Sequence, residues 1–100
     1  MKVLNAFSLN MIRDFPVDVC VEKVADLSGL KNLESAIGHA DTAVIFSQVL
    51  GVDLPMNRTS VVLDRGETVL VGQYVGPRLP EGVKTLPVGA VINWFFVTLK

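Results

Sequence analysis

The residue best suited to chemistry in this chain is its single histidine, His39, which follows Gly38 where an apolar segment gives way to a helical one. Histidine is the side chain best able to move a proton near neutral pH. A strand-to-helix turn also directs free backbone N–H groups toward one point, which favours an anion such as phosphate. Gly38 lets backbone approach such a ligand closely, and Thr42 adds a hydroxyl group. The pattern favours acid–base chemistry on a phosphate compound.

Several other side chains are candidates to assist His39. Arg78 can hold a phosphate and neutralise developing charge, while Glu81 can orient His39 or keep it protonated. Arg58 is a second candidate phosphate ligand. The polar side chains that follow the first apolar run are candidates for contacts with bases or ribose hydroxyls. They are Asn5, Ser8 and Asn10.

Each candidate also has a structural interpretation. A solitary histidine in a small domain is more often structural than catalytic. The arginines fit ordinary surface positions, Glu81 fits a solvated turn, and the polar residues near the first strand fit turn caps. Asp41 is better placed to stabilise a helix dipole than to act as a general base. The residues alone leave both interpretations open.

Residue counts narrow the possible chemistry. With one His and one Cys there is no zinc cluster, and the acidic residues lack the clustering of a Mg²⁺ site, so we expect no metal and no other cofactor. A second histidine is missing, which excludes a two-histidine acid–base pair within one chain. A single acid suffices for RNA, because a ribose 2′-OH can attack its own phosphodiester while the protein protonates the departing 5′-oxygen.

Charge and hydropathy narrow the class of protein. Ten acidic and nine basic residues give a net charge of −1, which argues against a surface for double-stranded nucleic acid. The lone Cys20 excludes an intrachain disulfide and fits a reducing compartment. The stretch after Lys2 is too polar for a signal peptide, and the uncharged run Thr85–Leu99 is shorter than the roughly 18 residues of a membrane span. We expect a soluble, cytoplasmic protein with no membrane partner.

The elements that must position these residues follow an α/β pattern within one small domain, residues 1–100. Apolar residues at a helical period predict a helix over residues 41–50, with Val49 on its buried side, ended by Gly51. Apolar runs predict strands at the following positions. They are residues 3–7, 17–22, 33–37, 61–63, 69–75 and 94–99. We expect a mixed sheet of about five strands with helices packed on it.

Three connections carry more specific expectations. Residues 64–67 predict a hairpin turn that joins the strands 61–63 and 69–75. Residues 26–32 predict a turn or a short helical piece, and a short helix is expected after Pro87. The alternation of Val17, Val19 and Val21 with polar residues predicts a half-buried second strand.

Four segments of the chain, in this order and at this spacing, resemble the viral ring nucleases. They are Asn5-Ala6-Phe7-Ser8-Leu9-Asn10, Ser35-Ala36-Ile37-Gly38-His39, Met56-Asn57-Arg58 and Arg78-Leu79-Pro80-Glu81-Gly82. That family comprises type III anti-CRISPR proteins of archaeal viruses and bacterial phages, once described as a domain of unknown function. The resemblance covers nearly the whole chain.

The resemblance implies an enzyme that degrades cyclic tetra-adenylate, the second messenger of type III CRISPR systems. It implies a homodimer that binds the ring between its subunits and cuts it without metal into linear di-adenylates ending in 2′,3′-cyclic phosphate. By position, His39 matches the general acid and Glu81 the assisting acidic residue. The remaining matched positions contact the ligand or line its pocket. They are Arg78, Ser8, Asn5, Asn10, Thr42 and Arg58, together with Gly38 in the turn.

The chain departs from that family at two places. Asp41 stands where some relatives have a small hydroxyl residue, and the chain after Leu86 is interrupted where relatives have a regular helix. The loop between Gly76 and Gly82 is expected to be a flexible lid.

Two other functions stay open. One is a sponge that binds a cyclic nucleotide without cutting it, and the other is a protein-interaction module with Arg58 and Arg78 far apart.

Overall fold

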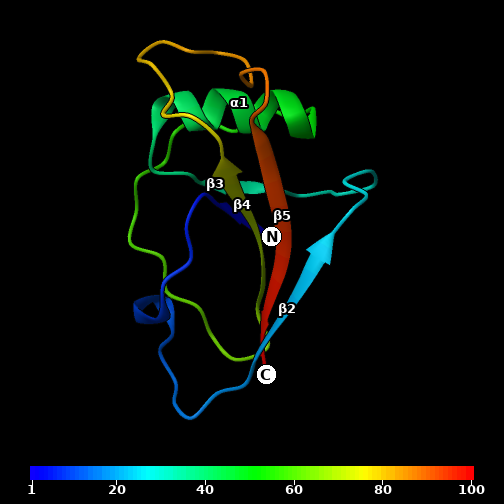
Figure 1. Cartoon of the computed structure of the whole chain (residues 1–100). Coiled ribbons are helices and arrows are strands. Elements are labelled where there is room, and N and C mark those ends of the chain that lie inside the picture. Colours follow the sequence, from blue (N-terminus) through cyan, green and yellow to red (C-terminus); the bar gives the residue numbers. More distant parts are fainter.

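Five apolar segments pair into one mixed sheet in the structure, a computed structural model that describes all 100 residues. In chain order the strands are β1 (Lys2–Leu4), β2 (Val19–Val24), β3 (Glu34–Ala36), β4 (Thr68–Val75) and β5 (Val91–Leu99). Their order across the sheet is β2-β5-β4-β1-β3. β1 runs parallel to β3 and β4. β5 is antiparallel to β4 and β2 (Figure 1). The predicted α/β domain is confirmed, although one α-helix covers the sheet instead of several.

The three parallel strands form a split β-α-β unit in which β1 lies between β3 and β4. The helix α1 (Ala40–Leu50) lies between β3 and β4 in the chain. Because β1, β3 and β4 are parallel, their carboxyl ends lie at the same edge of the sheet. The turn at Gly38, the segment after Leu4 and the loop after Val75 therefore start at one edge, although they are far apart in sequence.

An aromatic contact over a glycine attaches α1 to the sheet. The ring centroids of Phe46 and Trp94 are 4.8 Å apart, and both side chains are buried. On β4, a Cβ atom at Gly72 would come within 2.6 Å of the Trp94 ring and 2.7 Å of the Phe46 ring. The missing side chain of Gly72 thus provides the space that the rings fill. The same core continues with Val3, Ile37 and Leu70.

The predicted helix is confirmed to within one residue at its start. Gly51 ends it in the left-handed conformation, with a φ of 72°, and its N–H donates to the Ser47 carbonyl. Ala43, Ile45 and Phe46 face the core. Val49, predicted on the buried side, is 41% exposed, so that part of the prediction is wrong; the adjacent Leu50 is the residue that packs against the core.

The opposite face of the sheet is covered by chain without regular structure. Leu63 forms an isolated parallel bridge with Ile12, and both side chains pack under the sheet beside Leu4 and Val71. The predicted hairpin between 61–63 and the next strand is wrong. Both edges of β4 are already paired, with β1 on one side and β5 on the other, so β4 has no free edge for a hairpin partner.

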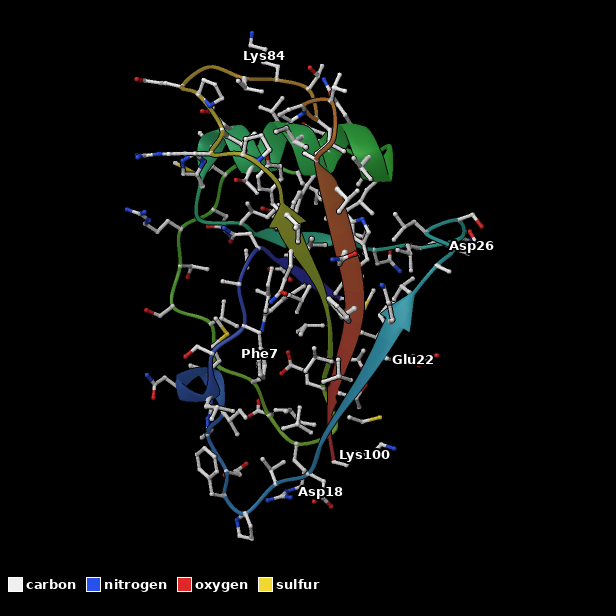
Figure 2. All side chains as sticks on the ribbon, in the orientation of Figure 1. Phe7, Asp18, Glu22, Asp26, Lys84 and Lys100 are labelled. Carbon is white, nitrogen blue, oxygen red and sulfur yellow. The ribbon has the colours of Figure 1, made fainter.

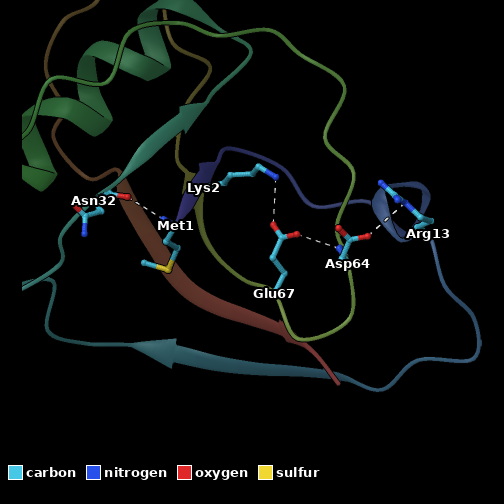
Figure 3. A network of polar contacts seen from close by, with 6 residues as sticks. All are labelled: Met1, Lys2, Arg13, Asn32, Asp64 and Glu67. Atoms are coloured by element: carbon cyan, nitrogen blue, oxygen red, sulfur yellow. Dashed lines mark hydrogen bonds and ion pairs between the residues drawn. The ribbon is translucent and has the colours of Figure 1, made fainter.

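Polar contacts fasten the 64–67 turn to the amino-terminal part of the chain (Figure 3). Lys2 Nζ lies 3.3 Å from Glu67 Oε2, and Glu67 Oε1 accepts the Asp64 N–H at 3.1 Å. Arg13 Nε lies 3.5 Å from Asp64 Oδ1. That last pair is mostly exposed and contributes little to stability. The Lys2 contact ties the turn to β1, the central parallel strand.

The connection between β2 and β3 is a turn, as predicted for residues 26–32. Asp26 Oδ1 accepts the Ser28 hydroxyl at 2.7 Å and the Ser28 N–H at 2.9 Å. These two bonds, the hydroxyl bond first, hold the pKa of Asp26 below its usual 3.8. The ammonium group of Met1 donates to the Asn32 carbonyl at 2.9 Å and so closes the connection over the start of β1.

Two predictions at the sheet periphery are wrong. The expected half-burial of the second strand fails, because β2 is an edge strand whose Val19 and Val21 are 37% and 59% exposed. The expected helix after Pro87 is a turn closed by the Ala90 N–H on the Pro87 carbonyl. β5 starts at Val91, earlier than predicted, because it pairs with β4 along the full length of that strand.

We predict that Gly72→Ala destabilises the fold by about 1–3 kcal/mol, because the added methyl group overlaps the Phe46 and Trp94 rings. The measurement is the free energy of unfolding from urea denaturation. The control is Gln73→Ala at the neighbouring exposed position, which should change it by less than about 0.5 kcal/mol. Equal stability of the two variants would contradict this account of how the helix is attached.

Candidate functional site

His39 lies at the amino-terminal end of α1 as its N-cap residue. Its side chain is exposed, and Nδ1 accepts the Thr42 N–H at 3.5 Å. The Thr42 Oγ1 atom lies at the same distance from Nδ1. A nitrogen that accepts a hydrogen bond carries no proton, so in this arrangement the proton of the neutral ring is on Nε2. His39 thus stabilises the helix start and also leaves Nε2 free for other contacts.

The turn before His39 is held by polar residues from two other segments. Asn5, directly after β1, accepts the Gly38 N–H on its Oδ1 at 3.2 Å. Asn57 extends the edge of β3 by donating its N–H to Ile37 and its side-chain amide to the carbonyl of Ser35, both at 2.8 Å. These bonds account for two polar residues of the segments singled out from the sequence.

Arg58 follows Asn57 in the chain and lies beside the same turn. The Arg58 Nε atom is 3.9 Å from the position that a Cβ atom on Gly38 would occupy. The guanidinium group therefore starts beside the turn that precedes α1. Arg58 therefore lies next to Gly38, the residue that precedes His39 in the chain.

An open cleft of about 940 Å³ lies between the start of α1 and the loop that follows β4. Its lining brings together His39, Asp41 and Thr42 of the helix start with Arg78 and Glu81 of the loop. The free N–H groups of the first helical turn open on the same side, where they favour an anion. The cleft thus combines an imidazole, a guanidinium group, two carboxylates and a helix amino terminus.

The loop over this cleft is attached near both of its ends. The Tyr74 hydroxyl donates to the Pro77 carbonyl at 2.6 Å. At the other end, the Gly82 N–H donates to Asp41 Oδ2 at 3.1 Å. Figure 1 shows this loop, coloured yellow to orange, crossing beside α1 on its way to β5. Both attachments use a residue outside the loop, Tyr74 at one end and Asp41 at the other, and the flexibility of the loop ends stays a prediction.

A smaller cleft of about 360 Å³ continues from the first one. Thr42 and Tyr74 line both clefts, and Asn5 and Gln73 line the smaller one. Sequence reasoning missed Gln73 and Tyr74. Their position at the carboxyl end of a predicted strand, at the same edge as Asn5, was the signal that pointed to them.

The predicted site residues divide into three groups. His39, Thr42, Arg78 and Glu81 line the main cleft, while Asn5, Gly38 and Arg58 lie beside it. Ser8 and Asn10 line neither cleft. Ser8 instead caps a short 3-10 helix, Leu9–Met11, by accepting the Asn10 N–H at 3.2 Å. That explains these two residues as a local turn, which was their structural interpretation.

Two further observations describe the chain as a whole. No group of three His, Cys, Asp or Glu side chains is close enough together to hold a metal ion. α1 is too short to cross a membrane, and the chain contains no other α-helix.

Comparison with known proteins places the chain among viral proteins. The family model described as STIV B116-like matches residues 1–87. "Uncharacterized protein 26" of Sulfolobus islandicus filamentous virus (isolate Iceland/Hveragerdi) is 32% identical over 71 residues, which is 69% of this chain and 59% of that relative's length. The solved structure of B116 of Sulfolobus turreted icosahedral virus has a TM-score of 0.75 at 24% identity, with 97% of each chain covered. The last similarity shows that the fold is shared.

We predict that His39→Ala lowers the free energy of unfolding by about 0.5–1 kcal/mol, whereas His39→Asn does not lower it. Alanine removes the acceptor for the Thr42 N–H, while asparagine is among the best N-cap residues. Thermal and urea unfolding of both variants measure the difference. Equal losses in the two variants would contradict the capping role of His39.

Proposed function

The chain belongs to the STIV B116-like family, and from this premise we propose that it is a viral metal-independent ring nuclease. Its substrate in this proposal is cyclic tetra-adenylate, and its products are linear di-adenylates with a 2′,3′-cyclic phosphate. Destruction of the messenger in the cytoplasm of the infected cell would suppress type III CRISPR signalling. The support comes from the four matched sequence segments and from the cleft that three of their charged or titratable residues line, His39, Arg78 and Glu81.

One observation carries the proposal: His39, Arg78 and Glu81 line the same cleft. A proton donor for the leaving oxygen and a cation for the phosphate both favour phosphodiester cleavage without metal, and a carboxylate can orient the proton donor. They come from opposite sides of the cleft, His39 from the start of α1 and the other two from the loop after β4. Residues this far apart in sequence meet because the segments after β3 and β4 start at one edge of the sheet.

The proposed reaction is an intramolecular transesterification that consumes no water. The ribose 2′-OH attacks the adjacent phosphorus, the P–O5′ bond breaks, and the 2′,3′-cyclic phosphate remains on the attacking nucleotide. The proton of the 2′-OH passes to solvent, and protonated His39 gives a proton to the departing 5′-oxygen. Arg78 neutralises charge on the phosphate, and Glu81 orients the imidazole. Two such cuts open the ring into two di-adenylates.

The helix cap and the proposed acid role use different atoms of His39. Proton donation requires an imidazolium ion, in which both ring nitrogens carry protons. Nδ1 then no longer accepts the Thr42 N–H, but it can donate to Thr42 Oγ1, which lies at 3.5 Å. Thr42 thus offers a partner to the ring in either protonation state, and Nε2 is the nitrogen that would face the substrate.

The symmetry of the proposed substrate supports a homodimer as the working form. One copy of the cleft presents a single arginine, Arg78, and a single histidine, His39. Since the ring has two-fold symmetry, two copies of the chain joined by an isologous interface would each present Arg58, Arg78 and His39 to it.

A sponge that binds the ring without cutting it is the second candidate. The capping bond of His39 favours it, because that bond explains the histidine without any chemistry. A protein-interaction module is less well supported. It requires Arg58 and Arg78 to be far apart, whereas both lie at the edge of the sheet that carries Gly38 and His39.

The deciding experiment incubates the protein with labelled cyclic oligoadenylates of several ring sizes in EDTA. We expect wild type to convert the four-membered ring into linear di-adenylate. We expect His39→Asn to bind the ring but to cleave it at least about 100-fold more slowly, because the cap is kept while the acid is lost.

The other results of this assay separate the alternatives. Tight binding by wild type with unchanged ligand identifies a sponge. No binding of any ring contradicts both nucleotide functions. Cleavage that survives in His39→Asn shows that another group protonates the leaving oxygen.

The cleavage step should slow as pH rises and His39 loses its proton, because only the imidazolium ion can donate. Single-turnover rates with saturating ring, measured from acidic to alkaline pH, test this dependence. The binding affinity measured in His39→Asn over the same range serves as the control for other titrating groups. A flat rate profile would contradict proton donation by His39.

A further inference from the structure

We propose that Asp41 is a positioning residue of this site. Its carboxylate holds the loop of residues 76–82 at the start of α1 and so sets Arg78 and Glu81 opposite His39. The part of this proposal that concerns the reaction rests on the proposed function, while the part that concerns the loop stands on the geometry alone. The sequence indicates only that Asp41 stabilises the helix dipole, and in the family resemblance Asp41 is a position at which this chain differs.

The hydrogen bond from Gly82 to Asp41 links the loop after β4 to the start of α1, two segments that lie far apart in the sequence. The Asp41 side chain lies in the first turn of α1, and its Oδ2 atom accepts the Gly82 N–H at 3.1 Å. Gly82 has a φ of 82°, a conformation that side chains other than glycine rarely adopt. A charged acceptor makes this bond stronger than a neutral one. The loop end is therefore fixed to the helix that carries His39.

The other end of the loop is fixed to the sheet. The Tyr74 hydroxyl reaches the Pro77 carbonyl at 2.6 Å, and Gly76 packs so closely against Ala90 that an added Cβ would be 2.7 Å from the Ala90 Cβ. Arg78 and Glu81 lie between these two attachments. The loop is thus set in place before any ligand binds, which reduces the cost of ordering its two charged side chains on binding.

The type of residue at position 41 decides whether this link can form. A serine or threonine hydroxyl is shorter than an aspartate carboxylate, so neither residue at position 41 would span the distance that Asp41 covers to Gly82. The carboxylate is also stabilised by the positive end of the helix dipole and by the Gly82 N–H. Both interactions offset the repulsion that its charge exerts on a phosphate.

The first test measures the loop and does not depend on any activity. Trypsin can cut the loop region after Arg78 and after Lys84, whose side chain extends away from the helix (Figure 2). We expect Asp41→Ala to accelerate both cuts several-fold relative to the cut after Arg65, which lies in a remote turn. In Asp41→Asn, trypsin should cut the loop at the wild-type rate, because the amide oxygen can accept the same Gly82 N–H.

Two matched variants complete this test. Asp53→Ala removes a carboxylate beyond the far end of α1 and should leave the loop cuts unchanged. Tyr74→Phe removes the second attachment and should also accelerate the cut after Arg78. Mass spectrometry of fragments ending at Arg78 or Lys84 gives the rates. Equal loop-cutting rates in wild type and Asp41→Ala would overturn the proposal, and so would a rate in Asp41→Asn equal to that in Asp41→Ala.

The second test measures cleavage of cyclic tetra-adenylate. Asp41→Ala should lower kcat by about tenfold with a smaller change in KM, because a misplaced loop spoils the alignment in the reacting complex. Asp41→Asn should keep the wild-type kcat. A general loss of stability in Asp41→Ala would not explain this difference between the two variants. Unchanged kcat in Asp41→Ala despite faster loop cutting would overturn the positioning role. If wild type cleaves no ring, the proposed function fails, and the trypsin rates still decide whether Asp41 holds the loop.

Discussion

The contact of Phe46 with Trp94 above Gly72 is the constraint on which the rest of the structure depends. The two rings lie 4.8 Å apart, and only a residue without a side chain fits beneath them on β4. This contact fixes the position of α1 on the sheet. Because the helix is rigid, it also fixes where its amino terminus lies, and with it the place of His39 at the carboxyl edge of the parallel strands. A shift of these rings would displace the whole cleft.

The same edge combines structural and chemical roles in a few residues. His39 caps the helix through Nδ1 and leaves Nε2 available, Asn5 holds the preceding turn, and Asp41 holds the facing loop. A small domain has few residues left over to hold the site residues in place. Here the site residues hold one another's segments by accepting hydrogen bonds from backbone N–H groups. This arrangement explains why substitutions that preserve a hydrogen bond are the informative ones.

The spacing of apolar residues correctly predicted the elements that can be recognised from near neighbours in the chain. The helical period before Gly51 and the apolar run of β4 are each visible within a short window. The hairpin expected for 61–63 failed because it depended on a free edge of β4, which β1 and β5 occupy. The half-burial expected for β2 failed for a related reason. Alternation shows which side chains share a face, but it does not show whether anything covers that face.

The sequence by itself determined the chemical inventory of this protein: one histidine, a turn that places it at a helix start, and a loop with one arginine and one glutamate. Only the tertiary structure decided which of these meet. It brought Arg58 to Gly38, kept Ser8 and Asn10 out of the cleft, and gave Asp41 a partner in Gly82. The physical reason is the separation along the chain over which each interaction acts. Periodicity and capping act between near neighbours in the chain, whereas strand order and long-range hydrogen bonds depend on how the whole sheet assembles.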